Sequence, residues 1–84
     1  MSEPALVVDV LGLRCPMPVL ELARRLDAAG LAPGSEVELV SDDPAAGADV
    51  PAWAAMRGHE FVDSEPAPTA QAPHAVRYRV RLGG

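Results

Sequence analysis

The sequence predicts an α+β fold, a two-layer α/β sandwich in which two helices cover one face of a four-stranded mixed sheet in the order βαβαββ. A compact strand, helix, strand pattern fills residues 5–41, and such a unit implies a right-handed crossover with parallel pairing. A second helical segment follows at 44–57, and alternating apolar and charged residues occupy 76–82. Because two helices cover only one face of the sheet, the other face is expected to contact water or a partner.

The first half of the chain supplies the strand, helix and strand in turn. Residues 5–11 are rich in β-branched side chains and stop at Gly12, which predicts a strand followed by a turn. Apolar residues recur at helical spacing within 16–29, and Gly30 is a natural helix end. Residues 36–41 alternate charged and apolar side chains and therefore predict a second strand.

The second helix has a clear beginning and an interrupted body. Asp43 followed by Pro44 is typical of a helix start. The Ala-rich segment beyond it, to Arg57, contains Gly47 and Pro51, both of which disfavour a helix interior. We therefore expect a broken or two-part second helix.

The last part of the sequence predicts two strands that are separated by a loop. Residues 59–65 predict a short strand, and residues 66–74 hold three prolines and no apolar repeat, which predicts a loop. Residues 76–82 have the period of a half-buried strand. Large apolar residues on a helix usually lie in the core, so Trp53 and Met56 are expected there.

The composition indicates one globular domain over residues 1–84. Apolar residues make up 49% of the chain and charged residues 23%, which excludes a disordered polyelectrolyte. No apolar run approaches the ~18 residues of a membrane span and no signal peptide is recognisable, so a cytoplasmic protein without membrane contact is expected. The net charge of -5 weakens attraction to nucleic acid, and direct binding of nucleic acid is not expected.

Cys15 is the residue that the sequence singles out for chemistry. It is the only cysteine of the chain, so it forms no internal disulfide. The presence of a thiol at this position therefore has to be explained by another role. A lone cysteine is most often a small buried hydrophobe. A position at a helix terminus between an arginine and a proline is typically at the surface, and this favours a reactive thiol.

The neighbours of Cys15 define its expected environment. Because Pro16 disfavours helical angles at the preceding residue, Cys15 is expected to cap the helix with Pro16 as the first helical residue. The helix dipole and the charge of Arg14 would then favour the thiolate. Pro18 removes a backbone donor from the first turn, which leaves the Met17 N–H as the expected partner of the sulfur.

Other titratable residues point to structural roles. Asp42 and Asp43 are expected at the same sheet edge as Cys15, with Asp43 mainly capping the second helix. A carboxylate too near Cys15 would oppose formation of the thiolate. His59 is expected to be structural and His74 to be solvated. One cysteine and two scattered histidines match no zinc spacing and no phosphate-binding loop is present, so neither a metal nor a cofactor is expected.

The motif Cys15-Pro16-Met17-Pro18 resembles that of the TusA/SirA-like family of small sulfur-carrier proteins. Further matching segments run along the chain: Asp9, Gly12-Leu13, Asp42-Asp43-Pro44, Asp49-Val50-Pro51 and Gly58-His59-Glu60. The resemblance implies the βαβαββ sandwich and a sulfurtransferase whose cysteine accepts sulfane sulfur as a persulfide. It also implies relay from a cysteine desulfurase or rhodanese-like donor to an acceptor protein that serves tRNA thiolation, cofactor biosynthesis or sulfur metabolism. Arg14 would provide charge support.

The chain departs from some members of that family at Ala54, where they carry a further cysteine. Without a second thiol, sulfur is passed to an external thiol or to the acceptor itself, which favours a carrier over a self-resolving redox enzyme. Two alternatives stay open. One is a regulatory or RNA-binding or protein-binding module that uses the strand face of Arg77, Arg79 and Arg81, although a solvated charged face explains the same pattern. The other is a peroxide-sensing thiol.

Overall fold

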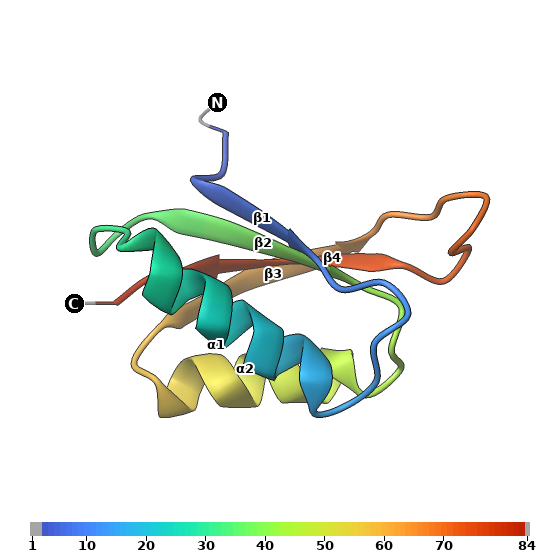
Figure 1. Ribbon diagram of the computed structural model, residues 1–84, viewed down its shortest axis with the longest axis horizontal. Helices are drawn as coiled ribbons and strands as arrows, with labels where there is room; N and C mark the ends of the chain where they lie inside the picture. The colour runs from blue at the N-terminus through green and yellow to red at the C-terminus, as the bar shows by residue number, and fades with distance from the viewer. Residues whose placement is uncertain (1–2, 84) are drawn as a thin grey trace.

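The computed structural model describes residues 3–83 and contains six elements in the order βαβαββ (Figure 1). They are β1 (Leu6–Asp9), α1 (Met17–Ala29), β2 (Glu36–Ser41), α2 (Ala46–Met56), β3 (Glu60–Pro66) and β4 (Val76–Arg81). The predicted two-layer sandwich is confirmed. The strand and helix bounds differ from the predicted ones mainly at their ends, and β1 and α2 are each three residues shorter than predicted.

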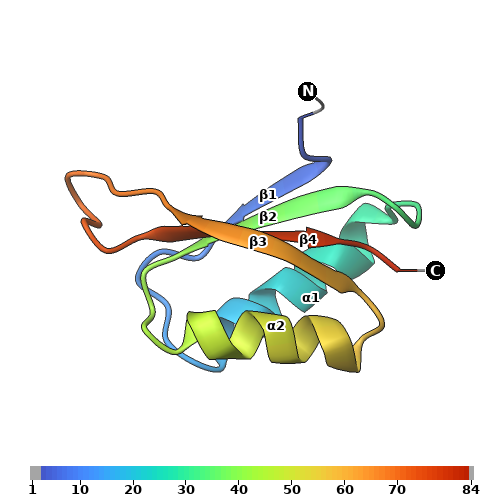
Figure 2. The same cartoon turned by 180° about the vertical axis from the view of Figure 1, so that it is seen from behind.

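The four strands form one mixed sheet in the order β1-β2-β4-β3. β1 and β2 are parallel, as the crossover predicts, whereas β4 runs antiparallel to both of its neighbours. Both helices lie on the same face of the sheet, as the two opposite views show (Figures 1 and 2). Neither helix within residues 3–83 combines the length and apolarity that crossing a membrane requires.

The core lies between the sheet and the helices because the two central strands, β2 and β4, alternate between buried and less buried residues. Val37 pairs with Val80 and Leu39 pairs with Tyr78, and all four side chains point to the helical layer and are buried. Leu22 of α1 closes this layer and has no exposed surface. The intervening residues of β2 and β4 are charged or half-buried and face the opposite side.

The second helix is continuous, which corrects the expectation of a broken one. Gly47 and Pro51 both lie inside α2. Pro51 lacks an N–H, so one intrahelical hydrogen bond is missing. The helix nevertheless continues because its inner residues, Val50 and Ala54 among them, are completely buried against the sheet. Tertiary packing here outweighs the unfavourable local propensity.

The end of α2 confirms one expectation and contradicts another. Trp53 is buried, as predicted, and its ring packs on His59 with 5.2 Å between ring centroids. Met56 is wrongly predicted as core, since it is 80% exposed beside the helix end. Nδ1 of His59 accepts a hydrogen bond of 3.0 Å from the Gly83 N–H, which agrees with a structural role for this histidine.

Candidate functional site

Two loops converge at one end of the sheet and carry the candidate site. Because β1 and β2 are parallel, the connections that follow them run side by side, as both views show (Figures 1 and 2). The Gly12 N–H donates to Oδ1 of Asp42 at 3.0 Å, and the Cys15 N–H donates to Oδ2 of Asp43 at 2.7 Å. The prediction that Asp42 and Asp43 share the sheet edge of Cys15 is therefore confirmed.

Cys15 lies in the β1–α1 connection, and its side chain is exposed. The buried-hydrophobe interpretation of this cysteine is thereby excluded. Residues 67–75, which join β3 to β4, extend past the same end of the sheet and away from the helices (Figure 1). The thiol is thus open to a reagent or a partner.

The start of α1 differs from the predicted arrangement. The helix begins at Met17, so Pro16 and not Cys15 occupies the capping position, and Pro18 is the second helical residue. The Met17 N–H donates to the carbonyl oxygen of Arg14 at 2.8 Å and is not free for the sulfur. This hydrogen bond closes a turn from Arg14 to Met17 that directly precedes the helix. Both expectations, a Cys15 cap and a Met17 partner for sulfur, are wrong.

Asp43 fastens the loop of Cys15 to the beginning of α2. The residue is only 7% exposed, and both oxygens of its carboxylate accept hydrogen bonds, Oδ2 from the Cys15 N–H and Oδ1 from the Ala45 N–H at 3.2 Å. Its own N–H donates to Oγ of Ser41 at 3.1 Å. The expectation that Asp43 caps the second helix is wrong, because α2 begins at Ala46 with Ala45 as its cap and without a side-chain cap bond. Asp43 instead holds the turn just before the helix and links it to Cys15, 28 residues earlier.

Arg14 pairs with a carboxylate beside the thiol loop. Its guanidinium lies 3.3 Å from Oδ1 of Asp42, and its side chain is 62% exposed. A hydrogen bond from the Gly12 N–H, followed by the charge of Arg14, lowers the pKa of Asp42. The positive charge of Arg14 is therefore partly compensated within the site.

The thiol of Cys15 has a raised pKa, which corrects the expectation of a stabilised thiolate. A hydrogen bond with the Asp49 carboxylate is the largest cause, followed by partial loss of hydration and by the negative charges of Asp49 and Asp43. These carboxylates outweigh the dipole of α1. The sequence analysis missed Asp49 as a neighbour of Cys15, although its place in the first turn of a helix that starts beside Asp43 was a usable signal.

The raised pKa predicts that Cys15 of the folded protein reacts slowly with iodoacetamide at neutral pH. Because only the thiolate reacts, the rate should rise with pH. The apparent pKa of this rise should be higher in the folded protein than in the urea-unfolded chain. Rates measured by intact mass across pH 6–11 for both states check this. A lower apparent pKa in the folded protein would contradict it.

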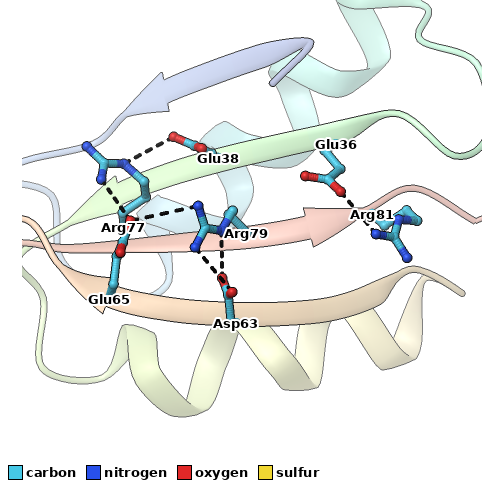
Figure 3. A network of polar contacts seen from close by, with 7 residues as sticks. All are labelled: Glu36, Glu38, Asp63, Glu65, Arg77, Arg79 and Arg81. Atoms are coloured by element: carbon cyan, nitrogen blue, oxygen red, sulfur yellow. Dashed lines mark hydrogen bonds and ion pairs between the residues drawn. The ribbon is translucent and has the colours of Figure 1, made fainter. Parts of the chain in front are cut away.

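The three arginines of β4 lie on the outer face of the sheet among carboxylates (Figure 3). Their ion pairs are Arg77–Glu38 at 3.1 Å, Arg77–Glu65 at 3.2 Å, Arg79–Asp63 at 2.7 Å, Arg81–Glu36 at 3.0 Å and Arg81–Glu60 at 3.2 Å. Every arginine of this row is thus compensated by neighbouring strands. The row is not a free basic patch, which favours the structural interpretation over binding of RNA or an acidic protein.

The fold and the site define a class: small α+β proteins with an exposed Cys-Pro-x-Pro thiol before the first helix. Residues 6–80 match the model of the family described as "Sulfurtransferase TusA". The chain belongs to this family, as the resemblance implied, and so has a broad role in sulfur transfer that involves other proteins. A crystal structure of a SirA-like protein from Desulfitobacterium hafniense has a similar fold, with 23% sequence identity and a TM-score of 0.66 over 94% of this chain and 99% of that chain.

Proposed function

We propose that this protein is a sulfur carrier in which Cys15 holds sulfane sulfur as a persulfide and passes it from a donor protein to an acceptor protein. The supporting observation is that the cysteine of the family motif is exposed while its backbone is held at 2.7 Å by the buried Asp43. Such a site presents sulfur to a partner from a fixed position.

The proposed loading step is an exchange between sulfur atoms. The Cys15 thiolate attacks the outer sulfur of a donor persulfide, a new S–S bond forms, and the bond between the two donor sulfurs breaks. The donor leaves as a thiolate and takes up a proton, while Cys15 retains the outer sulfur as Cys15–S–SH. No external oxidant is needed, because the sulfur already arrives in the sulfane state.

Release follows the same chemistry with the roles reversed. A thiolate of the acceptor attacks the outer sulfur of Cys15–S–SH, and Cys15 leaves as a thiolate that is reprotonated. A persulfide is more acidic than a thiol, so the loaded group ionises at a lower pH than the empty one. Since the chain has one cysteine, the sulfur leaves to another molecule and not through an internal disulfide.

The proposed donor is a cysteine desulfurase or a rhodanese-like protein, and the proposed acceptor serves tRNA thiolation, cofactor biosynthesis or another branch of sulfur metabolism. The test is intact-mass measurement after the reduced protein is incubated with a cysteine desulfurase and cysteine, and separately with a rhodanese and thiosulfate. We expect a gain of one sulfur atom that a thiol reductant removes. If neither donor adds sulfur, the proposed carrier function is wrong.

A further inference from the structure

Met17 is an exposed methionine that the chain holds next to the thiol. It lies two residues after Cys15, so the Cα atoms of the two residues are at most about 7.6 Å apart. Met17 is 48% exposed, although it is the first residue of α1. Its backbone is fixed, because its N–H donates to the carbonyl oxygen of Arg14 at 2.8 Å. An oxidisable thioether is thereby presented to solvent beside the candidate nucleophile.

The surface around Met17 is uncharged and partly apolar. Residues 15–20 include no charged side chain. Pro16 is exposed, and Leu20, which follows Met17 by three positions, is 54% exposed. Because residues three apart lie on the same side of a helix, Met17 and Leu20 form one exposed apolar patch. Burial of such surface favours association, and methionine is enriched in protein interfaces.

A protein that delivers sulfur to Cys15 is expected to cover Met17 as well. The two sulfur atoms must come within bonding distance, so the thiol lies inside the footprint of the donor. A specific interface covers about 800 Å² on each partner, or a disc of about 16 Å radius, which is about twice the largest separation between Cys15 and Met17. A small reagent such as iodoacetamide needs only the thiol. Comparing the two reagents therefore separates an effect on docking from an effect on the thiol.

We propose that Met17 is an oxidative modification site through which a peroxide controls the loading of Cys15 by a protein donor. This inference rests on the proposed function, because it concerns the docking of the donor. The thioether sulfur of Met17 attacks one oxygen of the peroxide, an S–O bond forms and the O–O bond breaks. The second oxygen takes the remaining proton and leaves as water, so the sulfur loses the two electrons that the peroxide gains.

The sulfoxide weakens docking because it places a polar oxygen in an apolar contact. The donor surface over Met17 and Leu20 displaces water from this oxygen, and an oxygen that is buried without a hydrogen bond is unfavourable. The modification is reversible, since a methionine sulfoxide reductase removes the oxygen as water while two thiols are oxidised to a disulfide. Loading thus responds to peroxide without any change at Cys15 itself.

The test compares the reduced protein with protein oxidised at methionine only. Cys15 is first blocked as a methyl disulfide, hydrogen peroxide is added and removed, and dithiothreitol then frees the thiol. Peptide mass spectrometry shows whether Met17 carries the oxygen. The measurements are the KM of the desulfurase for the carrier, or of the rhodanese if only the rhodanese loads it, and the rate of alkylation by iodoacetamide.

Oxidation is expected to raise the KM for the carrier roughly three- to thirtyfold and to leave the alkylation rate unchanged. Treatment with the reductase should restore the original KM. In Met17→Leu, which has no oxidisable sulfur at this position, peroxide should not change the KM of that variant. Met56→Leu is the matched variant and should keep the response, because Met56 is 80% exposed but ends α2, about 15 Å along the helix from Ala46.

Three results would each overturn the inference: a Met17 that peroxide leaves unmodified, an unchanged KM after its oxidation, or an equal rise of the KM in Met17→Leu. A parallel fall of the alkylation rate would also overturn it, because the sulfoxide would then act on the thiol and not on docking. Loading of the unoxidised wild type measures the carrier function separately. An absence of loading from both donors refutes the proposed function and this control with it.

Discussion

Replacing Cys15 by serine is expected to abolish sulfur acceptance completely and to leave the fold unchanged. Serine lacks the sulfur nucleophile, and no other cysteine is present to take over. Serine retains the backbone N–H that donates to Asp43, which is the structural contribution of this position. Because the side chain is exposed, the free energy of unfolding should stay within about 0.5 kcal/mol of the wild type.

The measurements for Cys15→Ser are intact mass after incubation with each donor and urea unfolding followed by circular dichroism. The wild-type protein, treated in parallel, provides the positive control. A reductant-sensitive sulfur on the variant would place the sulfur on a residue other than Cys15. A loss of loading accompanied by a large loss of stability would instead indicate that the serine disturbs the loop.

Asp43→Ala is expected to lower the free energy of unfolding by about 2–4 kcal/mol and to loosen the loop that carries Cys15. Asp43 is 7% exposed, and the substitution removes a carboxylate that accepts hydrogen bonds from the N–H groups of Cys15 and Ala45. Hydrogen bonds to a charged acceptor contribute more than neutral ones, and the donors left behind lie in a tight turn. A loosened loop should also slow sulfur loading at Cys15.

Urea unfolding gives the stability of Asp43→Ala, and loading by the desulfurase gives its function. Asp27→Ala is the control, since it removes an exposed carboxylate from a helix and should change stability by no more than about 0.5 kcal/mol. A stability equal to that of the wild type would show that Asp43 does not fasten the two loops. Asp43→Asn should be intermediate, because an amide offers one acceptor oxygen where the carboxylate offers two.

Local periodicity predicts the elements whose residues alternate or repeat regularly. The strand at 36–41 has the predicted bounds, and the helix at 16–29 begins one residue later than predicted. The continuity of α2 was not predictable from local sequence, because the burial of Val50 and Ala54 against the sheet outweighs Pro51. Local propensity describes a segment before it is packed, and packing decides the outcome here.

The exposed position of the candidate cysteine was predictable from the sequence, but the electrostatics around it were not. The neighbours of Cys15 along the chain suggested a positive environment, whereas the carboxylates of Asp43 and Asp49 come from a different loop and helix. Only the parallel pairing of β1 with β2 brings these groups to the thiol. The protonation state of Cys15 is therefore a property of the tertiary structure and not of the motif.

The strand order has a consequence for how the chain folds during synthesis. β4 is made last but lies between β2 and β3, and the contact between Glu36 and Arg81 closes a span of 45 residues. Until residues 76–81 leave the ribosome, β2 and β3 each keep an unpaired edge that would otherwise meet β4. Such non-local pairing slows folding, and these unpaired edges favour aggregation until β4 becomes available.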